Sequence, residues 1–319
     1  MTPAPALVAR FRQDCARLLG DVAGLRIALA VSGGPDSMAM LALAAAAFPG
    51  AVAAATVDHR LRADSAGEAA MVAGCCSDLG VPHATLPIVA SRPPSGNLHA
   101  WARAQRYALL LDWAAEAGCA ALLTAHHADD QAETVLMRLA RGSGVAGLAG
   151  IRAWQESDGI AIVRPLLAWR SVELRAIAVA TGVPFVDDPS NRNPVFERAR
   201  VRATLAALEW LDPVRVMASA RHAAEADDAL AALARLFWRD RAIERAGEIA
   251  IDMTELPREL RRRLARQAIR ALHPSAATDR IEPLLDALET GGSAMQGDVL
   301  ASAKGEIWRF RPAPPRRSH

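Results

Sequence analysis

Short apolar runs alternate with longer periodic runs over the first 125 residues of the chain. The short runs span residues 25–31, 51–57, 83–89 and 119–125, and the longer runs span residues 37–48, 64–79 and 97–117. Strands that are buried on both faces read as continuous apolar segments, and helical crossovers connect them in a parallel sheet. The pattern therefore predicts a Rossmann-like α/β fold with a doubly wound parallel sheet.

The pattern changes after about residue 163. Long helical runs dominate there, at residues 213–238 and 256–272, and the glycines and alternating residues near the end predict a small hairpin with a frayed tail. A length of 319 residues is consistent with about two domains. We predict an α/β domain over residues 1–212 and a smaller, mainly helical domain over residues 213–319.

Lysine is almost absent, because Lys304 is the only lysine among 37 basic residues. A Walker-type phosphate loop needs a lysine after its glycine-rich turn, and no glycine-rich turn upstream of Lys304 has one. A Schiff-base or pyridoxal enzyme would have to use this one residue. The composition therefore argues against both classes of chemistry.

Neither the N-terminus nor any later segment reads as a targeting or membrane-spanning sequence. Charged residues interrupt the apolar positions of residues 1–20, and no stretch approaches roughly 18 uninterrupted apolar residues. The four cysteines form no C-x-x-C pair, and small core residues in a reducing compartment are the simpler interpretation. We expect a cytoplasmic protein without a membrane partner.

A glycine-rich turn follows the first predicted strand and opens the next predicted helix. Two glycines let the backbone approach an anion, while the hydroxyls, the amides and the helix dipole stabilise it. Asp36 can cap the helix or hold Mg²⁺. The turn is therefore a candidate ATP-binding site, made by Ser32, Gly33, Gly34, Pro35, Asp36 and Ser37.

This SGGPDS turn resembles the pyrophosphate-binding loop of the N-type ATP pyrophosphatases, the PP-loop superfamily. Further segments resemble the tRNA(Ile)-lysidine synthetase family in order and spacing, across roughly residues 25–205. They are VDHRLR (57–62), NLHAWARAQRY (97–107), AHHADDQAET (125–134), RLARGSG (138–144), RPLL (164–167) and DPSN (188–191). Three positions depart from the family pattern: Arg60, His99 and Ala199.

The resemblance implies an ATP-dependent ligase that modifies tRNA. ATP would adenylate C2 of the wobble cytidine of tRNA(Ile) with a CAU anticodon and release pyrophosphate. Free L-lysine would then attack, AMP would leave, and lysidine would form. The implied cofactors are ATP and Mg²⁺. The sequence leaves the oligomeric state open, a homodimer included.

Four residues are candidates for the catalytic machinery: Asp36, His126, Asp130 and Glu133. Asp130 and Glu133 lie one helical turn apart on one face. With Asp36 they can hold Mg²⁺ or orient an amine, and we assign the metal to Asp36 and Asp130. Helix capping is the structural alternative for Asp129 and Asp130. A zinc cluster is disfavoured, because adjacent histidines at a strand end point to opposite sides.

The arginines divide into candidate tRNA contacts and ordinary surface. The resemblance points to Arg103, Arg106, Arg198 and Arg202 as tRNA-binding residues. Arginine-rich segments at residues 164–202 and 258–270 offer phosphate-contacting surfaces, although a solvated helix face is the simpler interpretation of such runs. The glycine-rich residues 142–150 predict a loop that closes over substrate, or a plain linker.

Two alternatives to lysidine synthesis stay open. A tRNA 2-thiocytidine synthetase would also activate C2 of a cytidine, but that chemistry commonly uses C-x-x-C cysteine pairs, which the chain lacks. A non-catalytic ATP-binding module would need neither Asp130 and Glu133 nor the arginine-rich second half.

Overall fold

The computed structural model describes residues 2–58, 65–89, 98–187, 197–208, 210–278 and 280–313, with the side chains of residues 98–100 excepted. It divides into two compact units, residues 1–224 and 225–319. The division falls inside helix α9 (Pro213–Arg241), whereas the sequence places a boundary at the start of this helix. A functional boundary after residue 212 stays a prediction.

The first unit is built on a six-stranded sheet in the order β3-β2-β1-β4-β6-β5. All neighbours pair in parallel except β5 with β6. Its strands are β1 (Ile27–Ala30), β2 (Val52–Asp58), β3 (His83–Pro87), β4 (Ala121–Leu123), β5 (Trp154–Ser157) and β6 (Ile160–Val163). The doubly wound α/β prediction is confirmed.

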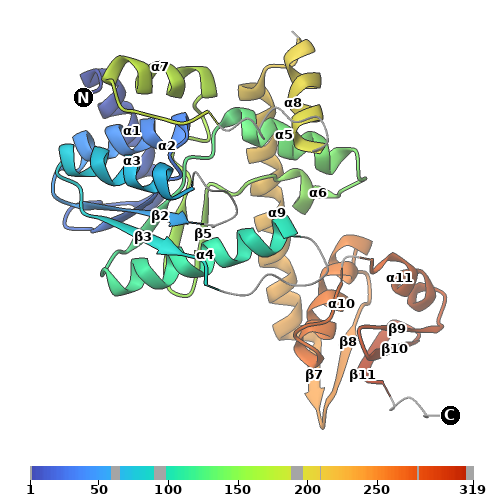
Figure 1. The fold of residues 1–319 in the computed structure, drawn as a ribbon. Helices are drawn as coiled ribbons and strands as arrows, with labels where there is room; N and C mark the ends of the chain where they lie inside the picture. Colours follow the sequence, from blue (N-terminus) through green and yellow to red (C-terminus); the bar gives the residue numbers. More distant parts are fainter. Residues whose placement is uncertain are drawn as a thin grey trace. The chain divides into compact units, whose positions relative to one another are not determined.

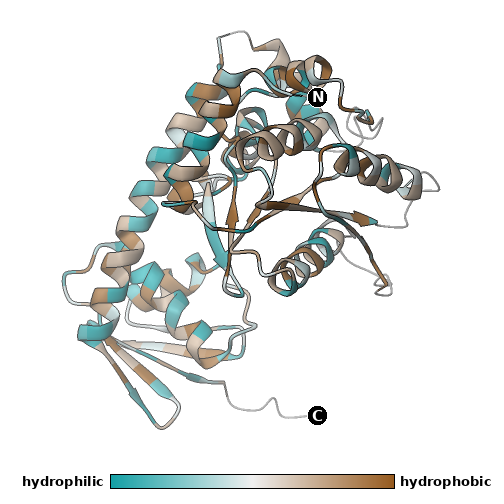
Figure 2. Ribbon diagram, turned by 90° about the vertical axis from the view of Figure 1, so that its left-hand side faces the viewer, coloured by the Kyte–Doolittle hydropathy of each residue, from teal (hydrophilic) through white to brown (hydrophobic). Residues whose placement is uncertain are grey.

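Helices cover both faces of this sheet (Figure 1). One face carries α1 (Pro5–Leu19), α2 (Pro35–Ala47), α3 (Ser65–Asp78) and α7 (Ser171–Thr181), and the other carries α4 (Leu98–Glu116). The strands between them are mostly hydrophobic along their whole length (Figure 2). Nine of the residues of α2 are buried, because the helix packs against α1 and α7 as well as β2. Burial on both sides explains why these elements read as continuous apolar runs.

Three further helices follow β4 or lie near the carboxyl ends of the strands: α5 (Ala128–Leu139), α6 (Val145–Leu148) and α8 (Glu197–Ala207). The turn at residues 32–37 follows β1, and α5 follows β4, the strand beside β1. In an open α/β sheet ligands bind beyond these strand ends. The topology therefore brings the glycine-rich turn and the start of α5 to one place.

The second unit contains a five-stranded antiparallel sheet in the order β7-β8-β11-β10-β9. The strands are β7 (Ala242–Arg245), β8 (Glu248–Asp252), β9 (Ser293–Gln296), β10 (Val299–Lys304) and β11 (Ile307–Pro312). Helices α10 (Arg258–Leu272) and α11 (Glu282–Glu289) share its core. The predicted hairpin is β10 with β11, and the sheet around it is larger than the sequence indicated.

None of the helices in the described ranges is long and apolar enough to cross a bilayer.

Candidate active site

The turn at residues 32–37 forms a compact loop closed by its two serines. Ser37 lies in the first turn of α2, and its hydroxyl donates to the Gly34 carbonyl at 2.9 Å. The Ser32 N–H donates to the Ser37 hydroxyl at 3.2 Å. Pro35 occupies the first position of the helix, because its fixed φ suits that place. The first backbone N–H groups of a helix have no partner within the helix, and the residues that carry them here line the cavity described below.

Gly33 is required by the shape of the loop. Its φ is +84°, a conformation that side-chain-bearing residues rarely adopt. A β-carbon there would make ordinary van der Waals contact with the side chains of Met71 and Val72 on α3, at 3.4 and 3.5 Å, so the backbone angle and not crowding requires glycine. The Gly33 carbonyl accepts from the Val186 N–H at 2.9 Å. The loop is therefore held from behind by two separate segments.

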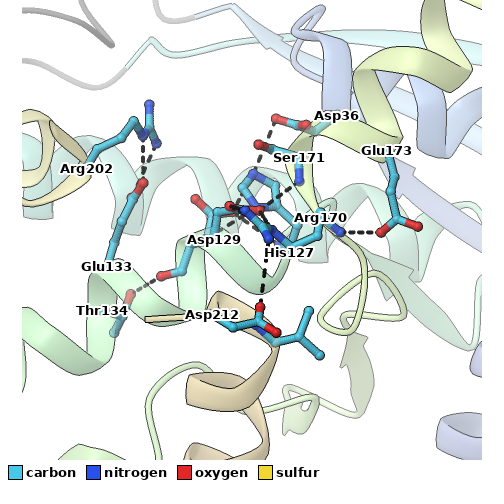
Figure 3. A network of polar contacts seen from close by, with 12 residues as sticks. Asp36, His127, Asp129, Glu133, Thr134, Arg170, Ser171, Glu173, Arg202 and Asp212 are labelled. Atoms are coloured by element: carbon cyan, nitrogen blue, oxygen red, sulfur yellow. Dashed lines mark hydrogen bonds and ion pairs between the residues drawn. The ribbon is translucent and has the colours of Figure 1, made fainter. Parts of the chain in front are cut away.

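His127 lies between three carboxylates at the start of α5 (Figure 3). Its Nε2 is 3.5 Å from Oδ2 of Asp36 in the loop and 3.4 Å from Oδ2 of Asp130. Its Nδ1 is 3.6 Å from Oδ2 of Asp129. Burial lowers the pKa of His127, but these carboxylates outweigh burial and raise it to about 10. An imidazolium therefore connects the loop to α5 at neutral pH.

Helix capping, the structural alternative for Asp129 and Asp130, is confirmed for Asp130, which takes part in a capping box at the start of α5. His127 occupies the N-cap position, and its backbone N–H donates to the Asp130 carboxylate at 3.2 Å. Asp130 also binds Arg198 through Oδ1, at 2.8 Å. Burial raises the pKa of Asp130, but the charges of His127 and Arg198 outweigh burial and hold the pKa below its usual value.

Asp129 faces the N-terminus of α7 instead. It accepts from Nε of Arg170 at 3.1 Å and from the Ser171 N–H at 2.8 Å. Burial raises the pKa of Asp129, yet His127, the Ser171 amide and Arg170 outweigh burial and hold it well below its usual value. Asp129 is therefore a carboxylate shared by two elements.

Glu133 is the most buried acid of the group, with 1% of its side chain exposed. It binds Nε of Arg198 and Nε of Arg202, both at 2.6 Å, through different oxygens. Because Arg198 also contacts Asp130, the prediction that Asp130 and Glu133 share a helix face is confirmed. Both arginines belong to α8, none of whose eleven residues is fully buried. Charge pairing therefore contributes strongly to holding α8 against α5.

These groups line one cavity of about 1410 Å³ in the first unit, together with arginines from α4. Arg103 donates to the Tyr107 hydroxyl at 3.4 Å, and its guanidinium lies 4.9 Å from the centre of the Tyr107 ring. Burial, and then the neighbouring Arg103, lower the pKa of Arg106. Arg170, Arg175, Arg198 and Arg202 also line the cavity. The space combines a phosphate-type loop with many cations, which suits a polyanionic substrate.

His126 lines the same cavity but differs from His127 in charge. Its Nδ1 is 2.9 Å from the Thr124 hydroxyl, and burial lowers its pKa to about 3 even though Asp130 raises it. A ring with this pKa is uncharged at neutral pH. His126 therefore offers hydrogen bonding rather than charge.

The glycine-rich residues 142–150 are anchored to α5. Arg138 donates to the carbonyls of Gly147 and Gly150, at 2.9 and 3.1 Å. The buried Gln131 amide donates to the Ile151 carbonyl and accepts from the Ile151 N–H, at 3.1 and 2.6 Å. These contacts hold residues 147–151 against α5, and closure of the segment over substrate stays a prediction.

Comparison with known proteins decides the family. A model of the PP-loop domain family matches residues 7–209. A curated tRNA(Ile)-lysidine synthase from Novosphingobium aromaticivorans is 42% identical over 97% of this chain and 94% of its own length. Another from Zymomonas mobilis is 40% identical over 92% of this chain and 90% of its own length. The chain belongs to the tRNA(Ile)-lysidine synthase family.

A solved structure shares the fold of this family member. The U34-tRNA thiolase NcsA from Methanococcus maripaludis, which carries a [4Fe-4S] cluster, superimposes with a TM-score of 0.58 at 17% identity. The match covers 69% of this chain and 78% of that chain. At this identity the likeness concerns the fold alone.

The structure brings together most of the residues that the sequence proposed for a lysidine synthase site. The cavity lining includes Ser32, Gly34, Pro35, Asp36, Ser37, Arg103, Arg106, His126, Asp130, Glu133, Arg198 and Arg202. Sequence reasoning missed His127, Asp129 and Arg170 as members of the site. The signal for His127 was its place before the acidic first turn of a helix, where side chains cap. Their roles in the reaction stay predictions.

Some segments that carried the resemblance lie outside the described residues. They include residues 59–62 of the first motif, with Arg60, and Asn97 with the His99 side chain in the second motif. The segment Asp188–Asn191 falls there as well. Ala199 is described, on α8.

Proposed function

We propose that the cavity of the first unit adenylates C2 of the wobble cytidine of tRNA(Ile) with a CAU anticodon, and then joins free L-lysine to it. The observation that carries this proposal is the placement of the SGGPDS loop and the acidic first turn of α5 on one cavity, bridged by His127 and Asp36. Membership of the family supports the substrate assignment.

The loop would stabilise the pyrophosphate leaving group. Backbone N–H groups at the start of α2, the two serine hydroxyls and the helix dipole all favour negative charge at this place. A lysine is not needed, because the nearby positive charge comes from His127 and the arginines of the cavity. Phosphoryl-type leaving groups depend mainly on such positioning and charge.

Magnesium fits one of the two predicted carboxylates better than the other. Asp36 lies at the loop with 30% of its side chain exposed, so that an oxygen can reach a metal bound to phosphate. Both oxygens of Asp130 already accept from cationic or amide groups. Among the described residues no group of three His, Cys, Asp or Glu could hold a metal alone. We therefore assign Mg²⁺ to Asp36 and the ATP phosphates, where it would neutralise phosphate charge.

Asp130 and Glu133 would act in the reaction through arginine. Their carboxylates hold Arg198 and Arg202 at the cavity wall, where the guanidinium groups can meet tRNA or nucleotide phosphate. Arg103 and Arg106 would approach the anticodon loop from α4, with the Arg103–Tyr107 pair offering a stacking surface for a base. His126 would hydrogen-bond substrate in the uncharged state.

In the second unit fewer arginines would contact tRNA than the arginine-rich segment of residues 258–270 suggested. On α10, Arg258, Arg261, Arg262 and Arg263 all pair with acids. Arg266 and Arg270 instead donate to the Thr278 carbonyl and hydroxyl, at 3.2 and 3.0 Å, and have no acidic partner among the described residues. Burial and the neighbouring Arg262 lower the pKa of Arg266. We assign phosphate contact to Arg266 and Arg270.

Neither alternative function gains support. All four cysteines are buried, none lines the cavity, and burial raises the pKa of each thiol. The cavity lining therefore provides no thiolate for sulfur transfer. A module that only binds ATP would leave the Arg198, Arg202 and Glu133 cluster without a purpose.

The test is ligation with purified protein, ATP, labelled L-lysine and unmodified tRNA(Ile). We expect lysine incorporation with equimolar AMP and pyrophosphate, and no incorporation into the methionine tRNA that shares the anticodon. Folded protein that incorporates no lysine would refute the proposal. A requirement for a sulfur donor would favour thiolation instead.

A further inference from the structure

His126 makes a single hydrogen bond, unlike the neighbouring His127. Its Nδ1 lies 2.9 Å from the Thr124 hydroxyl, and no other group in the described ranges forms a hydrogen bond or an ion pair with its ring. Thr124 directly follows β4, and both residues line the cavity. Within the described part of the chain, the Thr124 hydroxyl is therefore the only hydrogen-bonding partner that orients this ring.

The surroundings of the His126 ring keep it uncharged. Arg164 follows β6, and it lies beside Thr124 because the Thr124 N–H donates to the Val163 carbonyl at 3.0 Å. Arg164 is 3% exposed, and its guanidinium donates to a backbone carbonyl at 2.6 Å without an acidic partner among the described residues. Burial lowers the pKa of His126 to about 3, and Arg164 adds to this effect, whereas Asp130 opposes it. A neutral imidazole therefore lines the cavity.

The Thr124 hydroxyl determines which nitrogen of His126 carries the proton. A neutral imidazole donates through one nitrogen and accepts at the other. If Nδ1 donated to the Thr124 oxygen, the hydroxyl hydrogen would need a second acceptor, and the described residues provide none. Thr124 is only 6% exposed, so this hydrogen would be left almost without water, which is costly for a buried donor. The hydroxyl therefore donates to Nδ1, and the proton of the ring lies on Nε2.

We propose that Thr124 is a positioning residue that fixes His126 with its proton on Nε2, so that the cavity presents a neutral N–H donor to an oxygen of the bound nucleotide. The inference rests on the proposed function, since it assigns this donor to the adenylation and ligation steps. The hydrogen bond at one ring nitrogen of a histidine commonly sets what the other nitrogen can do. A neutral donor also contacts an oxygen without repelling the positively charged lysine, which distinguishes it from the arginines of the cavity.

Two variants of Thr124 and a matched control separate positioning from simple folding. Thr124→Val keeps the size of the side chain but removes the hydroxyl, whereas Thr124→Ser keeps the hydroxyl. The control is Thr181→Val, at a threonine that is 7% exposed, donates to the Ile177 carbonyl at 2.7 Å and lies outside the cavity lining. We expect Thr124→Val to lower kcat for AMP formation about 10²-fold with little change in the KM for ATP, because a preorganised donor is lost. Thr124→Ser should keep most of kcat, and the control should keep all of it.

A double variant tests whether Thr124 acts through His126. His126→Gln alone removes the ring, and it should lower kcat at least as much as Thr124→Val does. Adding Thr124→Val to His126→Gln should lower kcat by less than about threefold more, because the hydroxyl then has no ring to orient and the two effects are not additive.

A readout that needs no substrate tests the ring directly. In protein labelled with ¹⁵N-histidine, the ring signals show which nitrogen carries the proton, and His126→Gln identifies the signals of His126 among the eight histidines. We expect a protonated Nε2 and an unprotonated Nδ1 in the wild type, in Thr124→Ser and in the Thr181→Val control. In Thr124→Val the signals should report a mixture of the two neutral forms.

The outcomes distinguish this inference from the proposed function. If the wild type ligates lysine but Thr124→Val keeps kcat within about threefold, the inference is wrong. It is equally wrong if the loss persists in the His126→Gln background, or if the wild-type ring carries its proton on Nδ1. If the wild type makes no lysidine, the proposed function fails, and the NMR comparison alone decides whether Thr124 fixes the ring.

Discussion

Each unit contains a network of arginines and acids, but the two networks differ in where the acids lie. In the first unit, Arg198 and Arg202 bind Glu133, whose side chain is 1% exposed. In the second unit, Arg258 binds Glu282 and Asp286, whose side chains are 51% and 67% exposed. The arginines themselves are similarly exposed, at 44%, 45% and 39%. The burial of the acid therefore separates the Glu133 pairs from the Arg258 pairs with Glu282 and Asp286, whereas the Arg263–Asp227 pair of the second unit is itself largely buried, with side chains 15% and 13% exposed.

This difference in burial indicates different roles for the arginines of the two networks. A buried carboxylate needs its cation, so that the arginine is kept at the cavity wall at a defined position. An exposed pair is solvated on both sides and contributes about 0–1 kcal/mol to stability. We infer that the first network serves the reaction and the second decorates a helix surface. Four sets of substitutions test this contrast.

The largest effect should come from Asp36, which joins the first network to the loop through His127. We expect Asp36→Ala to lower the rate of AMP formation on the order of 10³-fold or more, because it removes the carboxylate that faces the phosphates. Binding of tRNA in a filter assay should change little. The matched control is Asp286→Ala in the second network, which should leave both measurements unchanged. Loss of tRNA binding in Asp36→Ala would contradict the role assigned to the loop.

Removing both cations of the first network should be the costliest change for stability. The double variant Arg198→Gln, Arg202→Gln leaves the Glu133 carboxylate buried without a cation, and we expect a loss of about 3–5 kcal/mol in urea unfolding. Adding Glu133→Gln to the double variant should restore part of this loss, because a neutral amide tolerates burial better. If the triple variant is no more stable than the double variant, Glu133 is not the buried charge that we describe.

Within α10, the contrast predicts two groups of arginines. Replacing Arg266 and Arg270 by Gln should weaken tRNA binding and lower the slope of log K against log salt by about one for each phosphate that is no longer bound. Replacing Arg258 and Arg262 by Gln should leave this slope unchanged, because acids already occupy these side chains. Equal slopes for the two double variants would remove the distinction.

The smallest effect should come from Arg258 alone. We expect Arg258→Gln to change the free energy of unfolding by at most about 1 kcal/mol, and by less in 1 M salt, where exposed pairs are screened. A loss of several kcal/mol, independent of salt, would show that the second network contributes as much to the free energy of unfolding as the first.

The sequence was sufficient for the first unit because its signals are local. Continuous apolar runs located β1, β2 and β4, and the turn between β1 and α2 carried the glycines and Pro35 in their observed roles. The second sheet was harder to see. Strands β7 and β8 are only four and five residues long, with the sequences AIER and EIAID, and they flank a turn in which Ala246 has a φ of +44°. Such short segments carry little period-two signal.

The sequence indicated several residues of the candidate site, but not the contacts between them. Asp36, Asp130 and Glu133 were recognisable from residue type and helix spacing. That His127 meets Asp36, 91 positions away, follows from the neighbouring ends of β1 and β4, and no local pattern reports it. The same holds for Asp129 on α5 and Arg170, the residue before α7. The sequence also makes Asp130 a candidate Mg²⁺ ligand, because no local pattern shows that Arg198 occupies its carboxylate.

Gly150 shows that a glycine can mark a lack of space instead of freedom of movement. A β-carbon there would lie 2.5 Å from Oε1 of Gln131, and the residue has a φ of +62°. Gln131 sits on α5, the rigid helix that begins at His127. Gln131 lies one helical turn after His127, and its N–H donates to the His127 carbonyl at 3.1 Å. A methyl group added at the buried Gly150 would therefore displace the side chain next to the histidine that faces the phosphate loop.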